Sequence, residues 1–267
     1  MGDNIFEIQN LSVDVFDMAR KPIIGAAPRL EILKDITFNI QHRDVIGIVG
    51  GSGSGKSTLG RAMLRLIEPS GGKIVFEGKD ITDLNESELR PLRRKFQMIF
   101  QDPMSSLNPR HRVAAIIGGP LKLHGFARVD FLIEEALDHV GLPKSFKFRY
   151  PHELSGGQRQ RIGIARAIAV KPNFILADEI VSGLDVSSQA KILSLLQKLV
   201  IDLGLTLAFI SHDLSVVRRL SNKIIVLKEG TLIESSLTNK LFKTPEHPYT
   251  EELLAAIPLP DPGQVWE

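Results

Sequence analysis

The stretch "GIVGGSGSGKSTL", from Gly47 to Leu59, decides the fold of this chain. It matches the pattern G-x-x-x-x-G-K-[ST], with Gly50 as the first glycine and Lys56 as the lysine. The apolar run Val45–Val49 predicts a buried strand before the loop, and the residues after Lys56 predict a helix. Glycines let the backbone approach an anion closely, and the N–H groups and dipole of a helix N-terminus attract it. The stretch therefore predicts a loop that holds the phosphates of a nucleoside triphosphate.

The side chains of this loop are expected to complete the nucleotide site. The Lys56 ammonium would reach the β- and γ-phosphates, and the Ser57 hydroxyl would coordinate Mg²⁺. The residues predicted to contact the nucleotide are Gly50, Gly51, Ser52, Gly53, Ser54, Gly55, Lys56, Ser57 and Thr58. The alternative is a flexible glycine–serine connection, which does not explain why strand, lysine and hydroxyl stand in register. The loop alone does not say which class of protein uses it.

Composition narrows the classes of protein. The 267 residues carry a net charge of +2, with 43% hydrophobic and 24% charged residues, as in an ordinary globular protein. This balance makes no case for a nucleic-acid partner. No apolar run is long enough to span a bilayer, and the N-terminus lacks the apolar segment of a secretory signal. The absence of cysteine excludes disulfides and cysteine-bound clusters. These features predict a protein of the cytosol.

The remaining pattern predicts an α/β core with two additions. Alternating residues over 5–15 and 31–40 predict antiparallel strands, and a further strand is expected in "KIVFEG" (residues 73–78). Buried strands are expected at Phe96–Phe100, Phe174–Ala177, Thr206–Ile210 and Lys223–Leu227, with a crossover helix over Ala190–Leu203. Residues 102–154 show no strong strand pattern and contain helical pieces such as "VDFLIEEALDHVGL" (residues 129–142). This segment is therefore expected to form an inserted helical subdomain.

A second motif, "LSGGQRQRIGIARAIAV" (Leu154–Val170), decides the class. It resembles the signature of the ATP-binding cassette (ABC) ATPases, whose five residues are here Leu154, Ser155, Gly156, Gly157 and Gln158. A hydroxyl and two glycines at a helix start form another anion-binding N-terminus, although a simple capped helix is the alternative. The resemblance implies a head-to-tail dimer, in which the signature of one subunit closes on the ATP held by the other.

The resemblance covers nearly the whole chain and implies its organisation. We expect a P-loop NTPase core of ABC type, with an antiparallel β subdomain and an inserted helical subdomain. The core and β subdomain would take about residues 1–101 and 166–235, and the helical subdomain with the signature about 102–165. About residues 236–267 would form a C-terminal tail.

Two carboxylates at the end of "FILADE" (residues 174–179) resemble the hydrolytic pair of the family. The resemblance implies that Asp178 holds Mg²⁺ and that Glu179 is the general base for the attacking water. Gln101, in "IFQDP", resembles the glutamine that touches Mg²⁺ and this water. The family usually has proline after the glutamate, whereas this chain has Ile180, from which we expect altered local stiffness and retained hydrolysis.

Three further residues resemble family positions. Asp185, in "SGLD", resembles the D-loop aspartate that communicates between the two sites of the dimer. His212, in "ISHDLS", resembles the switch histidine on the γ-phosphate, although an isolated histidine is more often structural. Phe16 stands where the family stacks an aromatic ring, usually tyrosine, on adenine.

The chain shows no sustained heptads and only one cassette, and it carries two longer motifs; together these features indicate which kind of ABC protein it resembles. A DNA-maintenance ATPase would need a long coiled coil or large insertion between the phosphate loop and the signature, and a translation-type ATPase would carry two cassettes in one chain. The stretches "FQDPMSSLNPR" (100–110) and "HPYTEELLAAIPLPDP" (247–262) resemble the oligopeptide/dipeptide importer ATPases, a group that also serves nickel. "SLNPR" favours the second of the two ATPases of those systems.

This resemblance implies partners and a location. The expected partners are a paralogous ATPase, two transmembrane permeases and, indirectly, a periplasmic solute-binding protein, with the chain on the cytoplasmic face of a bacterial inner membrane. A heterodimer is expected, and a homodimer stays open. Dipeptides, oligopeptides, antimicrobial peptides, nickel and opines all stay open as solutes.

The segment after Gln101 is expected to carry the permease contact. It offers an apolar set interrupted by proline and glycine, which predicts short helices around a groove for a permease helix. The apolar set is Met104, Leu107, Val113, Ile116, Ile117 and Leu121. Arg110 or Arg112 would stand at the rim, and the alternative is that the set only fills a core.

Overall fold

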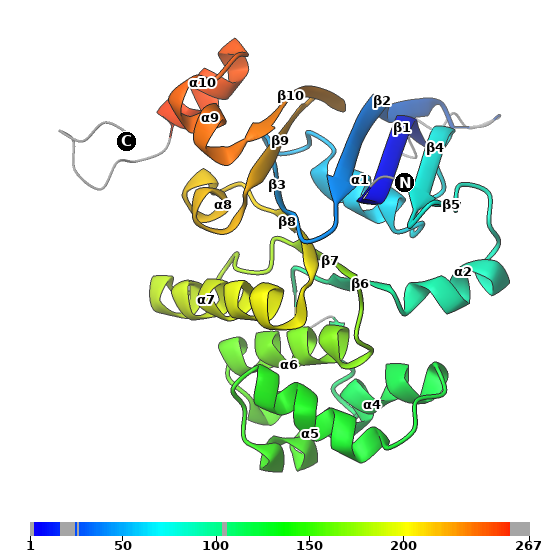
Figure 1. Cartoon of the computed structure of the whole chain (residues 1–267), viewed down its shortest axis with the longest axis vertical. Coiled ribbons are helices and arrows are strands. Elements are labelled where there is room, and N and C mark those ends of the chain that lie inside the picture. The colour runs from blue at the N-terminus through cyan, green and yellow to red at the C-terminus, as the bar shows by residue number, and fades with distance from the viewer. Residues whose placement is uncertain (1–2, 17–24, 26, 103–105, 257–267) are drawn as a thin grey trace. The chain divides into compact units, whose positions relative to one another are not determined.

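The computed structural model describes residues 3–16, 25, 27–102 and 106–256 (Figure 1). The chain divides into two compact units. The first unit comprises residues 1–84 and 209–267, and the second comprises residues 85–208. Each is described by itself. No helix among the described residues is long and apolar enough to cross a membrane.

An antiparallel sheet in the first unit follows from alternating residues. Strand β1 (Asn4–Phe16) pairs with β2 (Arg29–Gln41) on one side and with β4 (Gly71–Phe76) on the other, and the two-residue β5 (Lys79–Asp80) continues the sheet. Its apolar side chains face a core in which the Phe6 and Phe76 rings lie 4.9 Å apart between centroids. The three predicted strands, and with them the antiparallel β subdomain, are confirmed.

The phosphate loop of the first unit starts from a fully buried strand. Strand β3 (Val45–Val49) runs parallel to β9 (Lys223–Lys228), which pairs antiparallel with β10 (Thr231–Leu237). Helix α1 (Lys56–Met63) follows the loop. The other helices of this unit are α8 (Leu214–Leu220), α9 (Thr238–Lys243) and α10 (Pro248–Ala255). Strand β8 (Thr206–Ile210) begins in the second unit and ends in the first.

The second unit is mostly helical around two parallel strands, β6 (Phe96–Ile99) and β7 (Phe174–Asp178). The α-helices whose bounds the described residues give here are α2 (Glu86–Arg93), α4 (Val113–Leu123), α5 (Val129–His139), α6 (Gly156–Ala169) and α7 (Val186–Leu203). Two short 3₁₀ helices, η2 (Lys144–Phe148) and η3 (Pro151–Glu153), precede α6. Since the described residues between 102 and 154 form no strand, the predicted helical region is confirmed.

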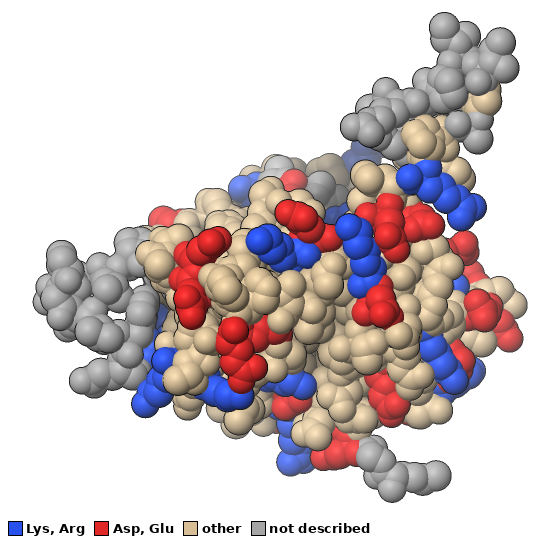
Figure 2. Space-filling view, turned by 90° about the horizontal axis from the view of Figure 1, so that it is seen from above, with Lys and Arg blue, Asp and Glu red and all other residues tan. Residues whose placement is uncertain are grey.

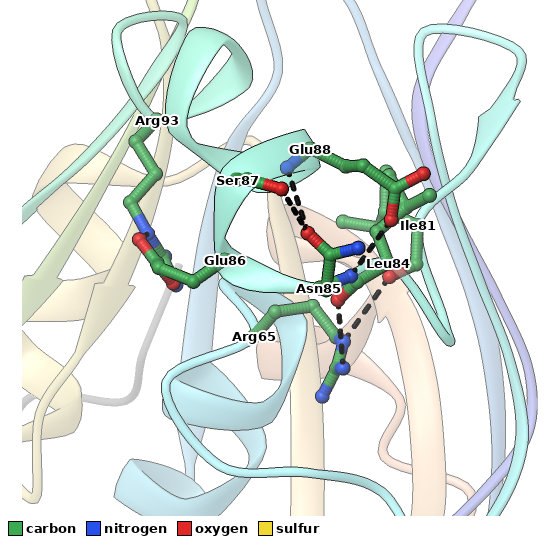
Figure 3. Close-up of polar contacts among 8 residues, drawn as sticks. All are labelled: Arg65, Ile81, Leu84, Asn85, Glu86, Ser87, Glu88 and Arg93. Carbon is green, nitrogen blue, oxygen red and sulfur yellow. Dashed lines mark hydrogen bonds and ion pairs between the residues drawn. The ribbon is translucent and has the colours of Figure 1, made fainter.

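Helix α2 begins at a capping box (Figure 3). The Asn85 side chain accepts a hydrogen bond from the Glu88 N–H at 3.1 Å, and the Glu88 carboxylate accepts one from the Asn85 N–H at 3.0 Å. Near the other end of α2, Arg93 forms an ion pair with Glu86 at 2.7 Å. In the first unit, Arg65 donates to two backbone carbonyls just before this helix, as Figure 3 also shows. The basic cluster "RPLRRKF" (residues 90–96) thus occupies the last turn of α2 and the residues that follow it.

Charges of both signs mix on the face shown in Figure 2, and no large area of it carries one sign alone. This mixing fits the near balance of 33 basic and 31 acidic residues in the sequence.

Candidate functional site

The phosphate loop, residues 50–57, owes its conformation to three glycines at positive φ. Gly50 has φ +149°, and a Cβ there would lie 2.2 Å from the Leu227 carbonyl oxygen. Gly55 has φ +98° and caps α1 in the left-handed region, while Gly53 has φ +75° with open space around it. Other residues would be strained at each of these positions. The loop therefore packs against β9 and leaves its middle accessible.

Lys56 folds back onto its own loop. The residue is only 6% exposed, and its ammonium donates to the carbonyls of Gly50 at 2.9 Å and Gly51 at 2.8 Å. The cation is thus held at the loop, where phosphate oxygens would meet it. Ser54 is also buried, and its Oγ has no hydrogen-bond partner among the described residues.

The structure brings all nine predicted loop residues together in one turn and the start of one helix. Ser52 and Gly53 are exposed, whereas Ser57 and Thr58 are half-buried in the first turn of α1. A helix start of this kind presents its N–H groups and positive dipole end to an anion. The arrangement can hold a polyphosphate.

The C-terminal helix α10 also reaches this loop, a contact that the sequence analysis did not identify. The Gly51 N–H donates to the Tyr249 hydroxyl at 2.9 Å, across 198 residues of sequence. The Lys228 ammonium lies 4.6 Å from the centroid of the Tyr249 ring. The segment "HPYT" was visible in the sequence, but nothing local indicated where its tyrosine would lie.

Phe16, the residue expected to stack on adenine, ends strand β1 and is 59% exposed. Its cross-strand neighbour is Arg29, whose guanidinium lies 5.7 Å from the centroid of the Phe16 ring. An exposed aromatic ring of this kind can stack on a planar base.

The predicted hydrolytic residues meet in the second unit. Asp178 is the last residue of β7 and is 2% exposed. Glu179 follows it at φ +47°, a left-handed conformation that Glu77 and Glu229 of the first unit share. The Gln101 side-chain amide donates to the Glu179 carboxylate at 3.0 Å, so two of the predicted residues are in direct contact.

Ile180, at the family's proline position, is 1% exposed and therefore fills the core behind these carboxylates. With isoleucine at this position, Gln101 and Glu179 are hydrogen-bonded at 3.0 Å. The predicted change in stiffness stays a prediction.

The signature residues start helix α6. Ser155 is its N-cap: the hydroxyl accepts from the Gln158 N–H at 3.4 Å, and the Gln158 side-chain oxygen accepts from the Ser155 N–H at 3.0 Å. Leu154 is buried, whereas Ser155 is exposed. The capping box fixes the helix start, and its exposed serine leaves the N-terminus open to an anion.

The D-loop aspartate lies at the same cavity as the signature. A cavity of about 700 Å³ within the second unit is lined by Ser155, Gly156, Gly157, Gln158, Asp185 and Ser188, among others. Asp185 caps α7 and accepts hydrogen bonds from the Ser187 hydroxyl at 2.7 Å, the Ser188 hydroxyl at 2.7 Å and the Ser188 N–H at 2.9 Å. These bonds lower the pKa of Asp185 well below its ordinary value, and the bond from the Ser187 hydroxyl contributes most.

His212 lies just after β8 in the first unit and is exposed. The next residue, Asp213, caps α8 through hydrogen bonds from the Ser215 and Val216 N–H groups. The backbone around the histidine is thus fixed, while its side chain reaches solvent.

The expected permease-docking set is corrected by the structure. The described members Leu107, Val113, Ile116, Ile117 and Leu121 are all at least 93% buried, so they fill the core of the second unit. Met104 lies outside the described residues. A groove of about 980 Å³ does exist beside α4, but other side chains line it, including Arg110, Arg112, Lys122, Arg128, Phe131 and Tyr150.

The residues predicted to bind Mg²⁺ offer a hydroxyl, an amide and a carboxylate oxygen, the hard donors that this ion prefers. The described residues contain no cluster of three or more His, Asp or Glu side chains that could cage a metal by itself. Such a set fits an ion that completes its shell with phosphate and water.

Comparisons with known proteins agree with this geometry. Residues 33–182 match the ABC transporter family. The oligopeptide transport ATP-binding protein OppF of Streptococcus mutans is 48% identical over 242 residues, which cover 89% of this chain and 79% of OppF. A Brucella ovis protein named for peptide import is 50% identical over 236 residues, 87% of this chain and 74% of its own.

Two solved structures share the fold. CbiO1 from Clostridium perfringens, part of the ABC transporter complex cbiONQ, has a TM-score of 0.78 and 28% identity, covering 91% of this chain and 92% of its own. A dimeric structure of the ATP-binding cassette MJ0796 bound to ADP and Pi has a TM-score of 0.76 and 30% identity. The match covers 87% of this chain and 98% of the MJ0796 chain. The chain therefore belongs to the ABC transporter family, as an ATP-binding and ATP-hydrolysing cassette of the α/β fold predicted from its sequence.

Proposed function

We propose that this chain is the ATPase subunit of a bacterial importer that takes up peptides or a closely related small solute. The observation that carries the proposal is the relationship to peptide-transport ATP-binding proteins, at 48–50% identity over 87–89% of the chain. The OppF relative also supports the second-ATPase type that "SLNPR" favours. The protein would work at the cytoplasmic face of the inner membrane.

The roles of the site residues are part of this proposal. Lys56 and the loop amides bind the ATP phosphates, Phe16 stacks on adenine, and Glu179 is the general base for water attack. Glu179 is supported by its place directly after Asp178 at the end of β7 and by its bond to Gln101. His212 contacts the γ-phosphate.

Mg²⁺ would be held by Ser57, Asp178 and Gln101. When bound, it neutralises charge that develops on the phosphates. The chain's own residues orient the nucleotide and hold the attacking water.

A second cassette is proposed to complete each site. The helix start at Ser155 and the aspartate at Asp185 line one cavity of about 700 Å³, which suits the γ-phosphate end of an ATP held by another subunit. The dimeric form of the cassette MJ0796 supports this pairing. The partner is a paralogous ATPase, because related peptide importers pair two different ones.

The permease contact is proposed at the groove beside α4. It is lined by four Lys and Arg side chains and the rings of Phe131 and Tyr150 against one carboxylate, Asp130, and the Arg128 guanidinium lies 4.6 Å from the Phe131 ring centroid. This chemistry suits an acidic amphipathic helix from a cytoplasmic permease loop. Arg112→Glu and Arg128→Glu should keep ATP binding and reduce co-purification with the permeases, whereas Lys198→Glu, on an exposed face of α7, should not.

Uptake measurements test the proposed function. A strain without this chain should lose uptake of labelled di- and oligopeptides, and the parent gene should restore it while Lys56→Ala should not. Restored uptake of nickel alone would keep the importer class and change the solute. No change in any uptake would overturn the proposal.

A further inference from the structure

We propose that Tyr249 is a positioning residue for ATP binding, through which the C-terminal helix α10 holds the phosphate loop in its nucleotide-binding shape. The proposal rests on the proposed role of that loop. It assigns a function to the "HPYT" segment, which otherwise lies outside the nucleotide-binding motifs.

The contact holds one residue of the loop from both of its peptide groups. The Gly51 N–H donates to the Tyr249 hydroxyl at 2.9 Å, and the Gly51 carbonyl accepts from the Lys56 ammonium at 2.8 Å. Gly51 therefore connects the tyrosine directly to the lysine that is expected to face the phosphates. Movement of the Tyr249 hydroxyl therefore alters the restraint on the Lys56 ammonium through Gly51.

The loop needs such a restraint because of its composition. Gly50, Gly53 and Gly55 all adopt positive φ, and the space around Gly53 is open. Glycine backbones lose more conformational freedom on ordering than other residues do. A fixed hydrogen bond at the start of the loop reduces the entropy that ATP binding would otherwise cost.

Hydrogen bonds at the start of α10 fix the position of Tyr249. Glu234 on β10 is 6% exposed, and its carboxylate accepts from the N–H groups of Glu246 and His247, each at 3.1 Å. His247 then caps α10 by accepting from the Tyr249 N–H at 3.0 Å. A buried carboxylate with two such bonds fixes the start of the helix and hence the position of the ring.

The ring has a second support from the strand beside the loop. Lys228, at the end of β9, places its ammonium 4.6 Å from the Tyr249 ring centroid, a cation–π distance. Tyr249→Phe keeps this ring contact and removes only the hydroxyl, so it isolates the hydrogen bond.

The first test measures MgATP affinity of the full chain by calorimetry. Tyr249→Phe should weaken binding by about threefold to tenfold, the range expected for one neutral hydrogen bond. Its melting temperature without nucleotide should stay near that of the parent. Affinity within the error of the parent value would overturn the proposal.

A matched control lies one residue away on the same helix. Thr250 is 1% exposed, and its Oγ has no hydrogen-bond partner among the described residues. Thr250→Val also deletes a buried hydroxyl from α10 but should leave MgATP affinity unchanged. An equal loss in both variants would show a general effect of the helix and would contradict a specific role of Tyr249.

The second test approaches the same bond from the loop. A Cβ on Gly51 would meet only the Tyr249 hydroxyl oxygen, at 2.9 Å, so Gly51→Ala should push the hydroxyl away and weaken MgATP binding. Adding Tyr249→Phe removes the clashing oxygen, and the double variant should bind no worse than Tyr249→Phe alone. Additive losses would contradict a direct connection.

Lys56→Ala separates this inference from the function on which it rests. The variant should lose MgATP binding whether or not Tyr249 matters. If Lys56→Ala binds normally, the role of the loop is wrong; if only Tyr249→Phe binds normally, the role of the tyrosine is wrong.

Discussion

At the residue scale, the most informative side chain is Lys56, because it is both buried and charged. Lys56 as a whole is 6% exposed, so its ammonium needs hydrogen-bond partners, and the carbonyls of Gly50 and Gly51 are two of them. Lys56→Ala removes the cation expected to face the phosphates. Since hydrogen bonds to charged groups contribute about 1.5–3 kcal/mol, ATP affinity should fall by about 10- to 100-fold or more. Calorimetry measures this, with Lys79→Ala on exposed β5 as the control; tight binding by Lys56→Ala would contradict the role.

Glu179 directly follows a buried strand and contacts a second predicted residue, Gln101. Glu179→Gln keeps the size of the side chain but cannot accept a proton from water, so hydrolysis should slow by about 10²–10⁴-fold. MgATP binding should remain. Phosphate release by the assembled transporter is the measurement, and turnover near that of the parent would require another base.

His212 is exposed after a buried strand, so it contributes little to packing. Because His212 is proposed to contact the γ-phosphate, His212→Ala should reduce ATP hydrolysis. Because the side chain is exposed, the melting temperature should stay unchanged. A large fall in melting temperature with normal hydrolysis would instead support a structural histidine.

The same scale shows why the sequence predicts some site residues and not others. The phosphate loop is a local pattern, and its strand, glycines and lysine occupy the 12 consecutive residues from Val45 to Lys56. The bond between Gly51 and Tyr249 joins residues 198 apart, and no local periodicity indicates it. The sequence around Glu179 likewise does not predict the left-handed backbone conformation of this residue, because glutamate prefers negative φ.

At the scale of elements, strongly patterned segments are predicted within a few residues of their bounds. Strand β8 matches its prediction at both ends, and α7 starts four residues before its prediction, at the Asp185 cap. Strand β10 was not predicted, because "TLIESSL" alternates weakly and buries one residue fully. The prediction that the apolar set after Gln101 forms a docking surface was wrong. Apolar residues with helical spacing indicate a buried face, and here that face packs into the core of the second unit.

The start of α7 provides a prediction that depends on pH. Asp185 caps this helix, and its pKa is lowered because its carboxylate accepts bonds from Ser187 and Ser188. A lowered pKa in the folded state means that the ionised cap stabilises the fold above the ordinary pKa of about 3.9 and that this stability is lost as pH falls below it. Asp185→Ala should therefore lower the melting temperature at pH 7, and the difference from the parent should shrink as pH falls below about 4. Asp185→Asn, which can still cap, should retain more stability; equal effects of Ala and Asn would contradict the cap.

At the scale of the whole molecule, ATP hydrolysis should depend on a second subunit. The signature at Ser155 and the aspartate Asp185 share a cavity in the second unit, while the phosphate loop belongs to the first unit. If each cavity completes a site on another chain, the purified protein alone should be mostly monomeric and weakly active. Size-exclusion chromatography and phosphate release over a range of protein concentrations measure this.

The partner's identity follows from the same experiment. If the chain pairs only with a paralogue, activity per molecule should stay low at all concentrations and rise when the paralogue is added. If it pairs with itself, activity per molecule should rise with its own concentration, and mixing Lys56→Ala with a signature variant, Ser155→Arg, should restore part of the activity that each lacks alone. One intact site forms in such a mixed dimer, because both defects fall in the other site, one in its phosphate loop and one in its signature. Full turnover of the dilute chain, independent of concentration, would show that a single chain completes its own site and would overturn the shared-site proposal.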